Sequence, residues 1–140
     1  MTPATWQTAT EDDTIALGRA IAAQLPRPAV VLLIGNLGAG KTTLAKGIVE
    51  GLGAATPDEV SSPTFTLIHE YAPGIWHIDL YRLETAREVA SLGLDDLFDR
   101  EDGVVLLEWA ERFPELMPPG CIEIRLTAHD DDTRTIELRR

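Results

Sequence analysis

Cysteine, lysine and asparagine are all rare in this chain. The single cysteine, Cys121, rules out an internal disulfide and a four-cysteine zinc site, and it indicates a reducing compartment. No apolar run approaches the length of a membrane span. No basic-then-apolar leader opens the sequence, so we expect a protein that is neither exported nor embedded in a membrane, with a cytoplasmic location.

Positive charge is also scarce. The chain carries 23 acidic and 12 basic residues, a formal net charge of −11, and only two of its basic residues are lysines, Lys41 and Lys46. Broad electrostatic capture of nucleic acid needs a basic face, which this composition cannot supply. We therefore expect no direct binding to RNA or DNA, and any role in nucleic-acid metabolism would run through a partner.

Length and composition predict a single domain over residues 1–140. The chain is 44% hydrophobic and 25% charged, which is typical of globular proteins. It contains no internal repeat, no low-complexity tract and no linker long enough to divide domains. A core of this size needs no disulfide or structural metal.

The first half of the chain predicts a helix, a buried strand and a second helix. Thr10 followed by three acidic residues is typical of a helix start, and Pro26 ends that helix. The continuous apolar run Ala29–Ile34 predicts a strand buried on both faces. The four-residue spacing of Leu44 and Ile48 then predicts a second helix.

The second half predicts hairpins, a further helix and a second buried strand. The expected elements are strands Thr64–Tyr71 and Ile75–Leu80, a helix Glu84–Leu94, an apolar strand Val104–Leu107, and strands Cys121–Thr127 and Arg134–Leu138. Buried strands that alternate with helices are the parts of an α/β fold, and the two hairpins make its sheet mixed.

The turn after the first buried strand matches a phosphate-binding motif. Residues Gly35–Thr42, G-N-L-G-A-G-K-T, fit G-x-x-x-x-G-K-[ST] in full. Glycines let the N–H groups of such a loop form an anion nest at a helix N-terminus, Lys41 would reach the β- and γ-phosphates, and Thr42 can ligate Mg²⁺. The predicted fold class is therefore α/β, a P-loop NTPase-like three-layer fold with a mixed, mainly parallel central sheet and β-hairpins.

The composition favours ATP over GTP. The only asparagine, Asn36, lies inside the loop, so the N-K-x-D motif with which GTPases usually recognise guanine is absent. No glutamine follows Gln24 to position a water molecule in the manner of Ras. The expected cofactors are ATP and Mg²⁺.

Two acidic residues are candidates for the chemistry. Glu108 follows the second buried strand, and a strand parallel to the P-loop strand would deliver it beside the Mg²⁺ or the attacking water. The choice between general base and metal ligand is open. We expect Asp79 near the Mg²⁺ and His77 as a neutral hydrogen-bonding residue, while a buried Asp79 that binds backbone N–H groups is an equal alternative. A zinc pair of His77 and Asp79 lacks further ligands.

Hydroxyl residues surround a proline in the segment Ser61–Thr66. Because it lies between the P-loop helix and the next strand, this segment could be a switch that senses the γ-phosphate. Composition alone favours an ordinary loop that enters a strand.

Four motifs in this order resemble the bacterial TsaE (YjeE) family, and the resemblance covers nearly the whole chain. The motifs are Gly35–Thr43, Ser62–Leu67, His77–Leu83 and Glu108–Arg112. The resemblance implies a small ATPase needed to form N6-threonylcarbamoyladenosine in tRNA. It also implies two partners, TsaB and TsaD, which carry out the transfer themselves and on which the ATPase docks to support their turnover.

The resemblance also implies roles for particular residues. Thr42 and Glu108 would bind Mg²⁺, Thr10 and Glu11 would lie near the adenine, and Trp109 matches the family's tryptophan. The implied catalytic residues are Glu108, Lys41, Asp79 and Thr64. The implied nucleotide-binding residues are Thr10, Glu11, Leu37, Gly38, Ala39, Gly40, Lys41, Thr42, Thr43 and Arg134. Many relatives have Asp where this chain has Asn36, so a contact there to the metal shell would differ.

Two other functions remain open on the sequence. The same loop could serve a small-molecule kinase, which would need an acceptor pocket and usually an arginine-bearing lid; Arg82, Arg87 and Arg112 are scattered candidates for it. Alternatively, the protein could be a nucleotide sensor that does not hydrolyse ATP and whose bound state controls docking.

Overall fold

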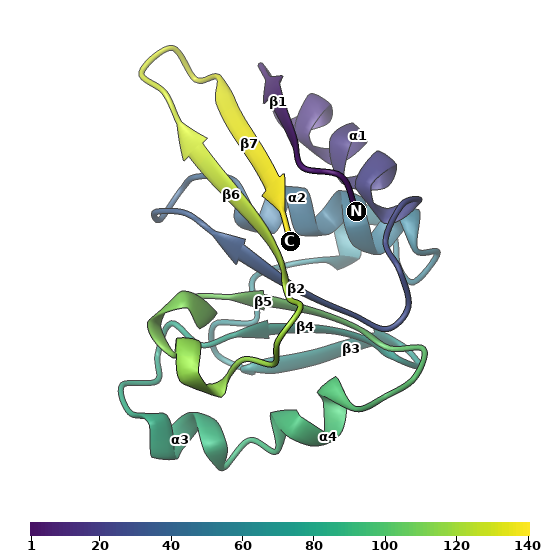
Figure 1. Ribbon diagram of the computed structural model, residues 1–140. Coiled ribbons are helices and arrows are strands. Elements are labelled where there is room, and N and C mark those ends of the chain that lie inside the picture. Colours follow the sequence, from purple (N-terminus) through teal and green to yellow (C-terminus); the bar gives the residue numbers. More distant parts are fainter.

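A computed structural model describes residues 1–140, and it contains seven strands, four α-helices and three short 3₁₀-helices (Figure 1). In chain order they are β1 (Ala4–Thr8), α1 (Glu11–Ala22), β2 (Ala29–Ile34), α2 (Lys41–Gly51), η1 (Pro57–Glu59), β3 (Ile68–Ala72), β4 (Ile75–Asp79), α3 (Ala86–Ala90), α4 (Leu94–Phe98), β5 (Val104–Glu108), η2 (Ala110–Arg112), η3 (Pro114–Leu116), β6 (Ile122–Ala128) and β7 (Arg134–Arg139). None of the helices is both long enough and apolar enough to span a membrane.

All seven strands belong to one sheet, in the order β1-β7-β6-β2-β5-β4-β3. The central strands β6, β2, β5 and β4 run parallel, while β3 at one edge and β7 and β1 at the other are antiparallel to their neighbours. The predicted mixed α/β sheet with hairpins is confirmed. The carboxyl ends of the parallel strands meet at one edge, where Glu108 of β5 pairs with Asp79 of β4 and Leu33 of β2.

Two separate apolar clusters cover the two faces of the central strands. Alternation along β2 sends Val31 and Leu33 into the cluster formed with α1 and α2, and Leu32 and Ile34 into the one formed with α3, α4 and η2. In Figure 1 α1 and α2 accordingly lie on one side of the sheet and α3 and α4 on the other. Burial on both faces explains why β2 and β5 are continuous apolar runs.

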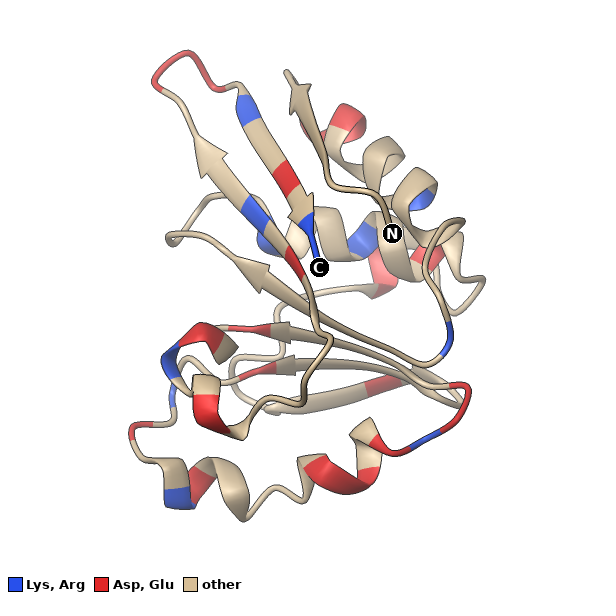
Figure 2. Ribbon diagram, viewed as in Figure 1, with Lys and Arg blue, Asp and Glu red and all other residues tan.

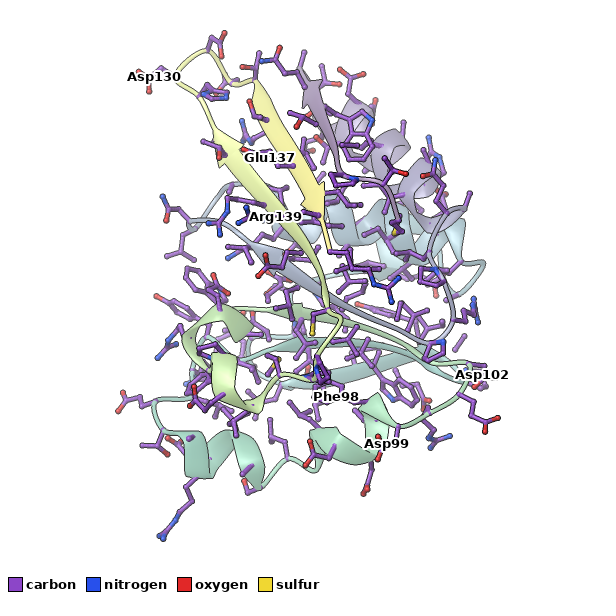
Figure 3. All side chains as sticks on the ribbon, in the orientation of Figure 1. Phe98, Asp99, Asp102, Asp130, Glu137 and Arg139 are labelled. Carbon is purple, nitrogen blue, oxygen red and sulfur yellow. The ribbon has the colours of Figure 1, made fainter.

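The layer formed by α3, α4 and η2 covers β2, β5 and β4 but not β6 and β7. On β6 and β7, one face is buried against the helices and the other carries polar side chains (Figure 3). There Arg125 lies opposite Glu137, and Arg139 Nε is 3.3 Å from Glu123 Oε2. Cross-strand ion pairs of this kind suit a solvated sheet face.

Two predicted elements differ from the structure. The predicted helix over 84–94 is only the short helix α3, and a second short helix, α4, begins at Leu94 after Gly93, which adopts a left-handed backbone (φ +72°). The predicted strand Thr64–Tyr71 starts only at Ile68, because Leu67 also has a positive φ of +66° and the residues before it form a turn. That segment is bound through its hydroxyls to Asp79, as described below.

The first strand was not predicted. β1 is a short edge strand whose Ala4–Thr8 register pairs antiparallel with β7. It places Thr8 and the start of α1 next to Arg134, so the N-terminal residues belong to the same end of the molecule as the P-loop.

Candidate functional site

A cavity of about 660 Å³ opens at the carboxyl edge of the parallel strands. Cavities of this size hold nucleotide-sized ligands. It brings together every residue predicted for the site except Ala39: Thr10, Glu11, Leu37, Gly38, Gly40, Lys41, Thr42, Thr43, Thr64, Asp79, Glu108 and Arg134. These residues come from six separate parts of the sequence, so only the fold assembles them.

Backbone geometry explains the glycines of the P-loop. Gly38 and Gly40 have φ values of +78° and +105°, which side-chain-bearing residues rarely adopt. At Gly35 the reason is close approach, since a Cβ would lie 2.7 Å from the Leu126 carbonyl oxygen. Ala39 is buried, and its N–H donates to the Asn36 carbonyl oxygen at 3.0 Å, so this amide holds the turn together.

The N-terminus of α2 has no capping side chain, in contrast to that of α1. Thr10 Oγ1 accepts a hydrogen bond from the Asp13 N–H at the start of α1, and three acidic residues occupy that first turn. Gly40 precedes α2 with no side-chain cap, and the first turn of α2 has no acid. The free N–H groups at the start of α2 therefore have no capping side chain and no acidic residue of their own turn to bind, which suits an anion in the cavity.

Lys41 is held inside the cavity rather than extended into solvent. Its Nζ donates to the Gly35 carbonyl oxygen at 2.7 Å and lies 3.5 Å from the centre of the Trp109 ring. Burial lowers the pKa of Lys41, and the negative charges of Glu108, Glu111 and Asp79 partly offset that effect. The ammonium group has no carboxylate within ion-pair distance, so its charge remains available to a phosphate.

Thr42 and Glu108 meet on the floor of the cavity. The Thr42 hydroxyl donates to Glu108 Oε2 at 3.3 Å, and Glu108 is only 3% exposed. Two ligands at adjacent corners of a Mg²⁺ octahedron lie about 3 Å apart. A hydroxyl and a carboxylate at this separation fit Mg²⁺, which binds few protein ligands and completes its shell with phosphate oxygens and water.

Asp79 ties the segment before β3 to the end of β4. Its Oδ2 accepts hydrogen bonds from the hydroxyls of Ser62 at 2.9 Å and Thr64 at 3.0 Å, and its Oδ1 accepts from the Tyr81 N–H at 2.8 Å. The carboxylate is 1% exposed and thus fully engaged within the protein. The Ser62 and Thr64 hydroxyls also lie 2.8 Å from each other, so both hydroxyls and this carboxylate form one connected group.

His77 contacts Glu108, as expected of a hydrogen-bonding residue. Its Nε2 lies 2.6 Å from Glu108 Oε2, and the ring is completely buried. No group of three or more His, Cys, Asp or Glu side chains is arranged to hold a metal ion. His77 and Glu108 form a buried contact next to the candidate Mg²⁺ position, and of the two only Glu108 lines the cavity.

Arg134 contacts the outer side of the P-loop. Its Nε donates to the Ala39 carbonyl oxygen at 3.1 Å, and its Nη1 donates to the Asp132 carbonyl oxygen at 2.9 Å. Thr10 and Glu11 line the same cavity at the N-terminus of α1. Arg134 thus links the β6–β7 hairpin to the loop whose amides face the cavity.

The sequence did not indicate two aromatic contacts of the site. Tyr81 lines the cavity and packs 5.0 Å from Trp109 between ring centroids. Trp109 has a positive φ of +67°, an unfavourable backbone for tryptophan that turns the chain directly after Glu108 and places the indole over Lys41. The only sequence signal for Tyr81 is its position two residues after Asp79.

The P-loop joined to a parallel strand, the uncapped helix and the acidic residue on the adjacent strand define a small α/β protein of the P-loop class. Comparison with known proteins agrees. A family model described as "Threonylcarbamoyl adenosine biosynthesis protein TsaE" matches residues 8–136. The chain belongs to the TsaE family.

Individual relatives support this assignment over nearly the full length. The tRNA threonylcarbamoyladenosine biosynthesis protein TsaE of Nostoc sp. is 42% identical over 93% of this chain and 82% of its own. The protein of the same name from Bacillus subtilis is also 42% identical, over 94% of this chain and 82% of its own. The crystal structure of Bacillus subtilis YdiB superposes with a TM-score of 0.78 at 35% identity, covering 98% of this chain and 84% of that one.

Proposed function

We propose that this protein is a Mg²⁺-dependent ATPase that supports the formation of N6-threonylcarbamoyladenosine in tRNA by acting on the TsaB–TsaD transferase in the cytoplasm. Membership in the TsaE family supports the pathway. The observation that carries the activity is the contact between Thr42 and Glu108 beside an uncapped helix N-terminus. Together they offer a metal position and an anion position within one cavity.

Nucleotide binding uses the backbone and Lys41. The amides at the start of α2 would donate to the phosphates, and Lys41, which now donates to the Gly35 carbonyl, would bind the β- and γ-phosphates, which are stronger acceptors because they are charged. Thr10 and Glu11 line the same cavity at the start of α1, and we assign them to the base end of the nucleotide. Arg134 donates a hydrogen bond to the Ala39 carbonyl oxygen, which keeps this carbonyl turned away from the phosphates.

Hydrolysis depends on the two acidic residues. Mg²⁺ held by Thr42 and Glu108 would neutralise charge on the phosphates. Oε2 of Glu108 contacts both Thr42 and His77, while Oε1 makes no hydrogen bond within the protein and is left to orient the attacking water or the metal. Asp79 holds Thr64 near the γ-phosphate end through the hydroxyl contact.

Charge supports action through protein partners rather than on tRNA directly. Acidic side chains are concentrated in the α4–β5 region and the β6–β7 turn, and basic ones are scattered over separate elements (Figure 2). A tRNA-binding face needs clustered basic residues. We therefore assign tRNA contact to the TsaB–TsaD pair.

The test is to measure ATP hydrolysis with and without TsaB and TsaD, and tRNA modification in the same tube. We expect slow hydrolysis by the protein alone and faster hydrolysis with the pair. Lys41→Ala should abolish both activities, and Glu108→Ala should retain ATP binding but lose turnover. Normal tRNA modification in cells that carry only Lys41→Ala would overturn the proposal.

If instead Glu108→Ala left tRNA modification intact while Lys41→Ala abolished it, the protein would be a nucleotide sensor that needs no hydrolysis. This outcome separates the role of ATP binding from that of ATP turnover.

One observation favours a second function, a small-molecule kinase. A second, smaller cavity of about 470 Å³ adjoins the first, and Tyr81 and Trp109 line both. Arg82 and Arg112 both line this second cavity. Two arginines beside the γ-phosphate end would suit an anionic acceptor. Transfer of labelled γ-phosphate to a metabolite instead of water would establish this function.

A further inference from the structure

His77 is a polar residue in an apolar environment. All five residues of β4 are buried, and alternation places His77 on the same sheet face as Ile75 and Asp79. The ring is 0% exposed, its Nδ1 has no hydrogen-bond partner, and its one polar contact within the protein is that of Nε2 with Glu108. An apolar side chain would pack in this position without leaving a buried nitrogen unpaired. Stability alone therefore does not explain a histidine here.

The contact made by His77 converges with a second one on the same oxygen. Glu108 Oε2 lies 2.6 Å from His77 Nε2 and 3.3 Å from Thr42 Oγ1. The two contacts come from different elements, one from β4 and one from α2, so together they hold this oxygen in place. Because Oε2 is held in place, the other oxygen, Oε1, has less freedom to move. Glu108 lines the cavity, so this restraint acts on a group that a ligand can reach.

We propose that His77 is a positioning residue for Glu108. An Nε2–H that donates to the carboxylate holds it in the orientation that hydrolysis requires, and without this donor the carboxylate would adopt other rotamers and lose its alignment with Thr42. His77 does not line the cavity, so it acts through Glu108 rather than on the nucleotide itself. This inference rests on the proposed ATPase function and specifies how its acidic residue is held in place.

The decisive experiment compares three variants of the full-length protein with the wild type. His77→Leu removes the donor and keeps an apolar side chain of similar size. His77→Gln restores a donor, because the glutamine Nε2 lies at about the same distance from the backbone as the histidine Nε2. His69→Leu is the matched control, since His69 pairs with His77 across the β3–β4 ladder but is exposed and stacks on Tyr71.

We measure kcat and KM for ATP in the presence of TsaB and TsaD, together with ATP affinity by calorimetry. Loss of a group that orients a metal-binding side chain typically lowers activity about 10- to 100-fold. We expect this fall in kcat for His77→Leu, with ATP affinity in the absence of Mg²⁺ unchanged because the phosphate nest is intact. His77→Gln should recover most of the rate, and His69→Leu should match the wild type.

Several outcomes would overturn the inference. They are a wild-type kcat in His77→Leu, equal losses in His77→Leu and His77→Gln, or a loss in His77→Leu that persists in full when it is added to Glu108→Gln. The last result would mean that His77 acts independently of Glu108. Failure of the proposed function itself would appear differently, as no ATP hydrolysis by the wild type with its partners.

A spectroscopic measurement keeps the inference testable even if His77→Leu does not fold. In ¹⁵N-labelled wild-type protein, the imidazole of His77 should carry hydrogen on Nε2, with the shift of a strong hydrogen bond that disappears in Glu108→Ala. The exposed rings of His69 and His129 serve as internal references. If the only ring hydrogen were on Nδ1, Nε2 would have no hydrogen to donate to Glu108, and the assignment would be contradicted.

Discussion

The Nζ of Lys41 lies 3.5 Å from the centre of the Trp109 indole and 2.7 Å from the Gly35 carbonyl oxygen. This arrangement keeps the P-loop ammonium buried within the cavity before any phosphate is bound. A triphosphate that bound as proposed would compete with the indole and the carbonyl for Lys41, and it would be favoured because a charged acceptor binds an ammonium more strongly than a neutral one does.

The two lysines of the chain allow a matched test of the phosphate site. Lys41→Ala should weaken ATP binding by about 10- to 100-fold, the usual effect of losing one charge-assisted hydrogen bond. Lys46→Ala removes the same charge from the same helix outside the cavity and should leave the affinity within about twofold of the wild type. Isothermal calorimetry of both variants measures the difference. Equal losses would point to net charge rather than to the site.

The position of Trp109 predicts an optical signal for nucleotide binding. When Lys41 leaves the indole for a phosphate, the cation–π contact is lost and the emission of Trp109 should change. The chain has two other tryptophans, but Trp76 is buried in the core beneath α3 and α4 and Trp6 lies on β1, both outside the cavity lining. Titration of ATP should thus change the fluorescence of the wild type and leave that of Trp109→Phe nearly constant. A full signal in Trp109→Phe would contradict this reorganisation.

The lowered pKa of Lys41 predicts opposite effects of pH on ligand binding and on folding. Burial lowers the pKa below the usual 10.5, so the folded protein loses this proton at a lower pH than the unfolded chain. Between the lowered pKa and 10.5 the unfolded state binds more protons, and the contribution of Lys41 to stability rises with pH. Over the same window ATP affinity should fall, because the phosphates bind the charged form.

Two measurements check this dependence on pH. Calorimetry should show ATP affinity declining in the alkaline range, and denaturant titrations of Lys41→Met should lack the rise in stability that the wild type shows. Parallel stability curves for the two proteins would show that Lys41 does not carry the effect.

The hydrogen bonds of Asp79 predict a local effect of its removal. Asp79→Ala should release the segment 62–66, because the Ser62 and Thr64 hydroxyls lose their shared acceptor, and should destabilise the fold by about 1–3 kcal/mol. Hydrogen exchange should rise in that segment and at Tyr81. Asp131→Ala is the control, since Asp131 accepts from Thr133 in an exposed turn and its loss should leave residues 62–66 unchanged.

The close contact between α1 and α2 predicts that a glycine-to-alanine substitution there destabilises the protein, whereas the same substitution in most helices stabilises it. Replacing a glycine inside a helix by alanine ordinarily stabilises it by about 1 kcal/mol. At Gly47 an added Cβ would lie 2.0 Å from the Ile15 carbonyl oxygen, so Gly47→Ala must push the helices apart and should destabilise the protein by about 1–3 kcal/mol. Urea denaturation measures the change. A stabilised variant would show that this contact is looser than the structure indicates.

Local patterns in the sequence predicted the elements that depend on near neighbours. The boundaries of β2 match the apolar run Ala29–Ile34, and α1 begins after its Thr10 cap as expected. Elements controlled by distant contacts were missed or misplaced. β1 exists because β7 offers it an edge, and the segment before Ile68 leaves the strand because its hydroxyls bind Asp79.

The P-loop is evident from local sequence alone, because the glycines, Lys41 and Thr42 act within one turn, where the spacing of residues along the chain also sets their positions in space. The sequence also marked Glu108 and Asp79 as acidic residues at the ends of strands. The parallel register of β4 and β5 is visible only in the folded molecule, where Asp79 lies beside Glu108 and His77 contacts the Glu108 carboxylate. Pairing between strands far apart in the chain depends on side-chain packing over the whole sheet, which no local pattern encodes.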